Sequence, residues 1–380
     1  MDVAIAGVAE SDLGVTNSTI LELQTQAITR ALGDAGLALS DVDGLFTCGV
    51  SRFSATQVAE YLGIRPTWTD STMAGGSSYE IFIAHAAEAI RSGRCEVALI
   101  SFGSNQRSAQ TRSIGGVIDP HTPYAQFEMP YGPLNPITLY AFAAQRHMHE
   151  FGTTPEQLAE VAVAARAWAS LNPVAYRFGA GPLTVEDVLG TPIVSSPLHA
   201  ADCCLVTDGG GAVLVTSLDR ARALRSAPIV VLGHGETTTN NGMTQIPDLT
   251  DIGARVSGAR AFAMAGLTPA DIDVIQVYDS FTITVLLELE ALGFCARGEA
   301  GPFVSGGRIA PGGDVALNTS GGGLSYCHPG MFGILLLIEA VRQLRGEAGD
   351  RQVARAETAL CHGTGGILST HATVILGVDR

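Results

Sequence analysis

The sequence predicts an α/β protein made of two related halves, and two observations lead to this prediction. The first is an internal repeat of helix, turn and buried strand. The second is the composition, because a chain of 380 residues with 46% apolar and 16% charged residues is able to bury one large core or two medium ones. We therefore expect two copies of a β-α-β-α-β unit, each with an apolar sheet covered by helices.

The repeat pairs residues 35–48 with residues 265–278. Both copies contain Ala-Gly-Leu, then Asp-Val-Asp or Asp-Ile-Asp, then an apolar run, which ends at Cys48 in one copy and at Tyr278 in the other. This pattern is typical of a helix closed by a C-terminal glycine, a short turn and a buried strand. A second match follows in the same order, since glycine-rich segments at 75–79 and 321–326 both lead into a helix and a strand.

An insertion of different character interrupts the first half at about residues 107–195. It holds most of the predicted long loops, together with a helix that opens on a capping box formed by Thr154 and Gln157. We expect this insertion to cap the site in the first half. The segment Asp208-Gly-Gly-Gly-Ala-Val then predicts a turn and the closing strand of that half. The expected domains are residues 1–225 and residues 226–380.

Charge and cysteine content exclude several classes of protein. The net charge of −15 argues against a surface for nucleic acid or anionic membrane, which would need clustered basic residues. Seven cysteines without a CxxC pair indicate reduced thiols rather than disulfides or structural zinc. Because the sequence shows no signal segment and no apolar run of membrane-spanning length, we expect a cytoplasmic protein.

Four motifs carry a resemblance to a known family. Three are Asp208-Gly-Gly-Gly-Ala-Val, Tyr278-Asp279-Ser280-Phe281 and Cys361-His-Gly-Thr-Gly-Gly, and the most specific is the segment from Asn318 to Gly330. Together, over essentially the whole chain, they resemble the thiolase superfamily and in particular its lipid-transfer-protein-like branch. The resemblance implies the thiolase fold, in which two similar halves form a layered α-β-α-β-α core around a site for an acyl thioester.

The chain departs from the ordinary thiolase pattern at the nucleophile. Ordinary thiolases place a nucleophilic cysteine at the start of a first-half helix, where the helix dipole lowers the pKa of the thiol. Counting back from the helix around residues 86–90 places Gly76 at this position. Ser77 or Ser78 would reach it only by a register shift, and a serine nucleophile needs a dedicated base. The missing cysteine is therefore the main functional clue.

A second departure introduces phenols. Tyr278-Asp279-Ser280-Phe281 stands where ordinary thiolases have Asn-Glu-Ala-Phe, and Tyr326 lies two residues before His328. These changes resemble the steroid side-chain aldolases of the lipid-transfer-protein type. The resemblance implies an aldolase-type lyase that cleaves a β-hydroxyacyl-CoA to a shorter acyl-CoA and a ketone or aldehyde, with a steroid side chain as one candidate substrate. It implies no cofactor, since CoA is part of the substrate.

The resemblance points to five candidate catalytic residues. Tyr278 and Tyr326 are candidates for the proton transfers, and His328 is the candidate neighbour that a phenol with a pKa of about 10 needs to act as a base. His328 is also the candidate donor to the thioester oxygen, with Asn318 shaping the loop below it. Cys361 is a candidate to protonate Cα, although a buried cysteine is often only a small hydrophobe. Which group is base and which is acid stays open.

Two other functions remain open. One is thiolase-type acyl transfer, with Cys361, Cys327 or a serine taking the acyl group, and the other is a non-catalytic acyl-CoA-binding subunit. No motif defines the residues that bind CoA, for which the candidates are Arg107, Arg112, Arg146 and Arg177. By resemblance, we expect a homodimer paired through the first-half sheet near residues 97–100. A small partner with an OB-fold and a zinc ribbon would complete a heterotetramer.

Overall fold

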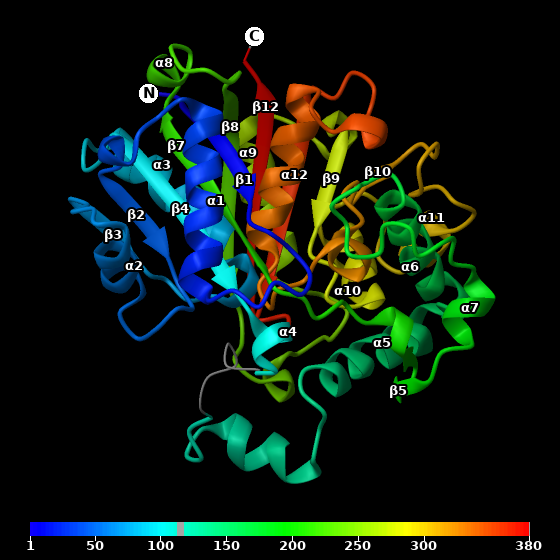
Figure 1. Cartoon of the computed structure of the whole chain (residues 1–380). Coiled ribbons are helices and arrows are strands. Elements are labelled where there is room, and N and C mark those ends of the chain that lie inside the picture. Colours follow the sequence, from blue (N-terminus) through cyan, green and yellow to red (C-terminus); the bar gives the residue numbers. More distant parts are fainter. Residues whose placement is uncertain (112–117, 380) are drawn as a thin grey trace.

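The computed structural model describes residues 1–111 and 118–379, and the strands of this part of the chain form one ten-stranded sheet and a small two-stranded sheet, β5-β6 (Figure 1). Each half of the chain contributes a five-stranded sheet to the ten-stranded one. The first-half strands are β1 (Val3–Glu10), β2 (Gly44–Thr47), β3 (Trp68–Asp70), β4 (Val97–Ser104) and β7 (Gly209–Ser217). The second-half strands are β8 (Ile229–Thr238), β9 (Val274–Val277), β10 (Ala316–Leu317), β11 (Thr358–Gly365) and β12 (Thr370–Val378).

The two five-stranded sheets have the same topology. Their strand orders are β3-β2-β4-β7-β1 and β10-β9-β11-β12-β8, and in each sheet only one strand, β7 or β12, runs antiparallel to the others. The sheets join where β1 pairs with β8, with Ala4 opposite Val230. The prediction of two related halves is confirmed. Each half is longer than the predicted unit, because a further helix and an antiparallel closing strand follow in the described residues.

Repeat-equivalent residues make equivalent contacts. Gly36 and Gly266 both end a helix in the left-handed region, with φ of 74° and 66°, where a glycine avoids the steric penalty of a Cβ. The carboxylate of Asp43 accepts hydrogen bonds from the amides of residues 96 and 97, and that of Asp273 accepts them from residues 357 and 358, at 2.8–3.0 Å. Each aspartate thereby fixes the start of the next parallel strand.

Helices cover and separate the two sheets. Between the sheets lie α3 (Ser78–Arg91) and α12 (Gly333–Arg345), which contact strands of both halves. The outer faces are covered by α1 (Ile20–Ala35) and α2 (Ser54–Leu62) in the first half, and by α9 (Ala254–Ala265) and α10 (Thr282–Ala291) in the second. Side chains alternate between the central and outer cores, so the expected α-β-α-β-α layers are confirmed.

The insertion does not lie where the sequence predicted. Its longest helices, α5 (Ile137–Phe151) and α6 (Pro155–Ala169), pack against α10 and α11 (Ala300–Val304) of the second half, in one apolar core with Leu286 and Leu287. Figure 1 shows them grouped beside α10 and away from α1. The expectation of a cap on the first half was wrong, because α1 and α2 already cover that sheet while the face of α10 is apolar. The remaining insertion elements are α4 (Gln106–Ala109), α7 (Val185–Leu189), β5 (Ile193–Ser195) and β6 (Leu198–His199).

The edge strand of the first-half sheet is β3, whereas the strand predicted at residues 97–100 lies inside the sheet. Those residues belong to β4, which is buried along its whole length and pairs with β2 on one side and β7 on the other. A strand paired on both sides has no free backbone groups to offer a second copy, so β3 is the strand of this sheet that is open to pairing. In the part of the chain that the structure describes, none of the helices combines the length and apolarity needed to span a bilayer.

Candidate active site

Tyr278 and His328 form the centre of the candidate site. Tyr278 directly follows β9, and His328 follows a π-helical turn at Gly322–Tyr326. The phenol oxygen of Tyr278 lies 3.0 Å from Nε2 of His328, and both side chains are buried, with 5% and 9% exposure. The site is thus at the C-terminal ends of the second-half strands, where α/β folds commonly bind their ligands.

The start of α12 supplies a second contact to the phenol. The backbone N–H of Phe332, the N-cap of α12, donates to the Tyr278 oxygen at 3.2 Å. A helix N-terminus carries a partial positive charge, so it stabilises negative charge on this oxygen. The rings of Tyr278, His328 and Phe332 pack together, with the histidine stacked on the phenylalanine. The phenol is therefore held on two sides by groups that favour a proton transfer.

Burial sets the protonation of the pair. It raises the pKa of Tyr278 well above its usual value and lowers the pKa of His328 to about 4. Both groups are neutral near pH 7, and in the tautomer of His328 that carries its proton on Nδ1, Nε2 accepts a hydrogen bond from the phenol. A neutral imidazole that accepts the phenolic proton is the neighbour that lets a tyrosine act as a base.

Tyr278 occupies the place of the missing nucleophile. Gly76, in the turn that opens α3, has no room for a side chain: a Cβ there would lie 2.1 Å from Cε2 of Tyr278 and 2.4 Å from the carbonyl oxygen of Thr364. A cysteine at position 76 and this tyrosine conformer therefore exclude each other. The two departures read from the sequence, at residues 76 and 278, are one structural change.

The neighbouring serines are not placed as nucleophiles. Ser77 is fully buried, donates to the carbonyl oxygen of Ala74 at 2.9 Å and is hydrogen-bonded to the hydroxyl of Thr370. Ser78, also fully buried, accepts from the amide of Ala74 at 2.9 Å. Neither hydroxyl bonds to an imidazole or carboxylate that would serve as its base, in the contacts of the described residues.

Comparisons with known proteins identify the family of this chain. Residues 235–378 match the family model described as Thiolase C-terminal domain-like. A 17-hydroxy-3-oxo-4-pregnene-20-carboxyl-CoA lyase of Mycobacterium tuberculosis is 35% identical, over 95% of this chain and 96% of the relative. An acetyl-CoA acetyltransferase of Methanothermobacter thermautotrophicus is 34% identical, over 97% and 98%. The solved Ltp2-ChsH2(DUF35) aldolase has a TM-score of 0.91 and 34% identity, and the match covers 100% of this chain and 98% of that one.

The chain belongs to the thiolase superfamily. Its lyase and aldolase relatives place it in the lipid-transfer-protein-like branch and confirm the predicted reaction class, an aldolase-type lyase. Because another relative is an acetyltransferase, acyl transfer stays the alternative function.

Asn318 bonds to the strand that leads to Tyr278. It has a positive φ of 47°, and its side-chain oxygen accepts from the amide of Val277 at 2.8 Å. It thereby holds the last residue of β9, directly before Tyr278. Asparagine is among the residues that best tolerate a left-handed conformation, which explains its use at this tight turn.

Tyr326 does not join the central pair. Its ring is buried against Phe332, but no described hydrogen bond links its hydroxyl to His328 or Tyr278. Burial raises its pKa, and the charges that act on it are mainly those of Glu10 and Arg342. His328 is the neighbour of Tyr278, although it is closer in sequence to Tyr326. Closeness in sequence misled here because the extended residues after the turn at 322–326 point successive side chains in different directions.

The two candidate cysteines are buried, and in the described contacts neither thiol bonds to Tyr278 or His328. The thiol of Cys361 contacts the carbonyl oxygen of Leu336 in α12 at 3.6 Å, and burial raises its pKa well above the usual value. Cys327 contacts the hydroxyl of Thr207 at 3.1 Å, and burial raises its pKa to about 12. Neither is a ready nucleophile, since only the thiolate attacks.

Three buried acids around the site were not singled out from the sequence. Asp279 accepts from the amides of residues 323 and 324 at 2.7 and 3.1 Å, and burial raises its pKa to about 7. Glu80, in the first turn of α3, and Glu288, on α10, are fully buried with pKa values raised by burial. The sequence did contain a signal for Glu80 and Glu288, because each lies within an apolar helical run, at residues 78–87 and 282–291.

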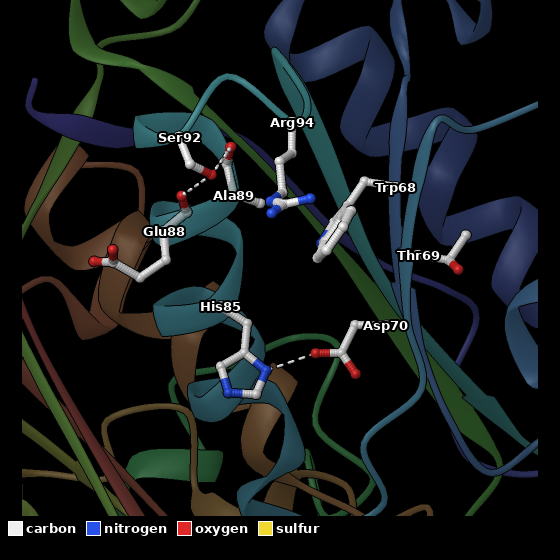
Figure 2. Close-up of a pocket in the computed structure, with 8 residues that line it drawn as sticks. All are labelled: Trp68, Thr69, Asp70, His85, Glu88, Ala89, Ser92 and Arg94. Carbon is white, nitrogen blue, oxygen red and sulfur yellow. Dashed lines mark hydrogen bonds and ion pairs between the residues drawn. The ribbon is translucent and has the colours of Figure 1, made fainter.

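A cavity of about 260 Å³ lies elsewhere, at the edge strand β3. Figure 2 shows Asp70 of β3 facing His85, with a hydrogen bond of 2.6 Å between them, and Trp68 of β3 facing Arg94. None of the predicted site residues lines it. The cavity is therefore separate from the pair formed by Tyr278 and His328.

Proposed function

We propose that this chain cleaves the Cα–Cβ bond of a β-hydroxyacyl-CoA by a retro-aldol reaction in which Tyr278 and His328 move the proton. One observation carries the proposal: the Tyr278 ring fills the space of the thiolase nucleophile while its hydroxyl bonds to a neutral imidazole. The site thus replaces a group that forms acyl-enzymes by a group that transfers protons.

The proposed reaction needs no covalent intermediate. The Tyr278 oxygen takes the proton of the substrate β-hydroxyl while its own proton passes to Nε2 of His328. The oxygen of the substrate becomes a carbonyl, the Cα–Cβ bond breaks, and its electron pair forms the thioester enolate. The same proton returns through Tyr278 to Cα, so the products are a ketone or aldehyde and a shorter acyl-CoA. A weakly basic imidazole suits this return, because it gives up the proton readily.

For the substrate, we propose a bulky ketone-forming acyl group such as a steroid side chain. The support is the relative named for a pregnene carboxyl-CoA and the loops at the mouth of the site. Residues 203–206 run beside the site, with the amide of Cys204 bonded to the carbonyl oxygen of Ser280 at 3.0 Å, and Val206 is exposed. Met73, three residues before Gly76 in the sequence, is also exposed.

We propose Arg166 and Arg177 as the residues that bind the CoA phosphates. Arg177 is exposed, and its amide bonds to the carbonyl oxygen of Ser325, which places it beside the site. Its charge contributes to lowering the pKa of the half-buried Arg166, so the two guanidinium groups are close to each other. Such a pair suits a polyanionic group. Of the other predicted candidates, Arg146 pairs with Glu150, Arg107 is exposed, and Arg112 lies outside the described residues.

We further propose a homodimer that pairs through the β3 edge, together with a small OB-fold and zinc-ribbon partner in a cytoplasmic heterotetramer. An unpaired edge strand invites pairing, and the cavity in Figure 2 lies against it. Large apolar side chains are exposed on nearby α2 and after β3, namely Phe53, Tyr61 and Met73. The partner is supported by the DUF35 subunit in the name of the solved aldolase relative.

A panel of CoA thioesters tests the function. The protein, alone and co-expressed with a zinc-ribbon partner, is incubated with β-hydroxyacyl-CoA and β-ketoacyl-CoA substrates, with and without free CoA. Cleavage of a β-hydroxyacyl-CoA without free CoA is the expected result. Cleavage of β-ketoacyl-CoA that requires free CoA, with an acylated cysteine detected by mass spectrometry, would establish the acyltransferase instead.

A further inference from the structure

An acid without a hydrogen-bond partner is buried beside Tyr278. Glu80 is 1% exposed, and neither of its carboxyl oxygens has a partner within the described residues. Glu80 lies one helical turn after Gly76, so both face the same side of α3. An unpaired ionised carboxylate in a protein interior is strongly unfavourable, so a buried acid in this position calls for a reason.

The carboxyl group of Glu80 fits into a slot made by glycines. A Cβ at Gly333 would lie 2.4 Å from Oε2 of Glu80, and a Cβ at Gly363 would lie 2.2 Å from the same oxygen. The carbonyl oxygen of Gly76 lines the slot as well, 2.3 Å from the same Gly333 Cβ position. Glu80 therefore touches α12 and β11 at positions where any side chain would displace it.

The slot is built from the segments that hold the Tyr278 phenol. Gly76 lies under the tyrosine ring, and Gly333 follows Phe332, whose amide donates to the phenol oxygen. Any change in the size of the Glu80 side chain would thus alter the spacing of these two segments. The carboxyl group acts on Tyr278 through this packing and through its charge.

The surroundings of Glu80 disfavour its ionised form. The groups that face it are Tyr79 on its own helix, Tyr278 after β9, Cys361 on β11 and Glu288 on α10, all neutral or acidic, and α12 contributes Gly333. Burial raises the pKa of Glu80 to about 8. Another fully buried glutamate, Glu339 on α12, has Arg351 at 2.9 Å, whereas no ion pair reaches Glu80 in the described residues.

Resting on the retro-aldol function proposed above, we propose that Glu80 is a positioning residue of this site that works as a neutral carboxylic acid. Its carboxyl group fixes the spacing of the segments around Tyr278, and its neutrality keeps negative charge away from the phenol and the developing enolate. An ionised Glu80 would repel the negative charge that develops on the phenol oxygen and on the enolate. Turnover should therefore fall about tenfold for each pH unit above about 8.

The pH dependence of kcat in Glu80→Gln and Glu80→Ala tests this role. Glutamine keeps the shape of a neutral acid but does not ionise, so kcat near pH 7 should stay within about threefold of wild type and the alkaline fall should move to higher pH. Glu80→Ala empties the slot and should lower kcat at least about tenfold with a smaller change in KM. An alkaline limb unchanged in Glu80→Gln would overturn the proposal, as would a folded Glu80→Gln protein that is inactive near pH 7.

Two measurements without substrate separate this proposal from the proposed function. The infrared difference spectrum of wild type minus Glu80→Gln should show a protonated carboxylic acid near pH 6.5, and its loss above about pH 8. The pKa of Glu80 in the folded protein lies above the usual value of 4.5 for a glutamate, so wild type loses stability relative to Glu80→Gln as pH rises from 4.5 to about 8. The difference in Tm should therefore grow over this range and then stay level.

Glu339→Gln is the matched control, since it alters a buried but paired glutamate on the other central helix. It should remove no protonated-acid signal and should destabilise the protein at neutral pH. If no thioester is cleaved by wild type, the proposed function fails, while the infrared and Tm data still decide the state of Glu80. An ionised Glu80 near pH 6.5 would overturn the inference even in an active lyase.

Discussion

The two halves of the molecule use equivalent positions for different purposes. Cys48 and Tyr278 both follow the second strand of their half, and both are buried. Cys48 has the hydroxyls of Tyr79, 4.0 Å from its thiol, and of Ser78 as neighbours, whereas Tyr278 has an imidazole and a helix N-terminus on its hydroxyl. Burial raises the pKa of both groups, but Tyr278 has an imidazole as a neighbour and Cys48 has hydroxyls, which are far weaker bases.

The two central helices show the same contrast at their starts. The turn that opens α3 offers space, because Gly76 leaves room for a ring from the other half, while the start of α12 offers a donor to that ring. The first half thus supplies the space at Gly76, and the second half supplies the phenol, the imidazole and the backbone donor. A duplicated fold is able to divide a single active site in this way, and the following experiments address that division.

The largest expected effect is that of Tyr278→Phe. Removing the hydroxyl removes the proton acceptor while the ring still fills the space at Gly76, so kcat should fall by about 10²–10⁴ with an unchanged Tm. Cys48→Ala, at the equivalent position, should change kcat less than about threefold. Steady-state kinetics of both variants check this, and a comparable loss in Cys48→Ala would remove the contrast between the halves.

Gly76→Ala should come next. Its Cβ would overlap the Tyr278 ring, so the ring must move away from His328, with a loss of kcat of about 10²-fold and a destabilisation of about 1–3 kcal/mol. Denaturant unfolding and kinetics measure the two effects. Gly33→Ala is the control, because a Cβ there meets nothing and the glycine lies on the exposed side of α1. Full activity in Gly76→Ala would contradict the assigned place of the phenol.

His328→Gln should have a smaller effect than Tyr278→Phe, about 10²-fold in kcat, because glutamine still accepts a hydrogen bond but does not take up a proton. The pKa of His328 is about 4, lowered by burial, so wild-type activity should show no loss from its protonation between about pH 8 and about pH 5. A kcat profile that falls with an apparent pKa near 6.5, and that does so only in wild type, would show an imidazole far more basic than its burial implies.

The smallest expected effect is that of Cys361→Ala. Its thiol is packed against α12 and makes no described contact with Tyr278 or His328, so kcat should stay within about threefold while the lost packing lowers stability modestly. Iodoacetamide should then inactivate wild type no faster than this variant. Strong loss of turnover, with the fold intact, would restore Cys361 as the group that protonates Cα.

The sequence was sufficient for the fold because the repeat reports on packing that both halves share. The residue pattern around Asp43 and Asp273 recurs since each aspartate performs the same task between two strands. The insertion was misplaced because the apolar face of α6 does not reveal which partner covers it. The order of the strands could not be predicted for the same reason, since the pairing of β4 on both sides is not encoded locally.

The site was predicted in its components but not in its geometry. Tyr278, His328 and Gly76 were each identified, yet the 3.0 Å contact between the first two and the overlap of the third depend on how α3 and α12 meet. Glu80 escaped notice because a glutamate in a helix is normally solvent-exposed. Its enclosure becomes visible only in the structure, where Gly333 and Gly363 lie against its carboxyl group.

The placement of the insertion means that the boundary near residue 225 is not a boundary of folding. A fragment ending there would carry α5 and α6 without the second-half helices that cover their apolar faces, and the complementary fragment would expose α10. The insertion thus leaves the first half and packs on the second half, so it holds the two halves together. A gene split at this point should yield two insoluble pieces that become soluble only when made together.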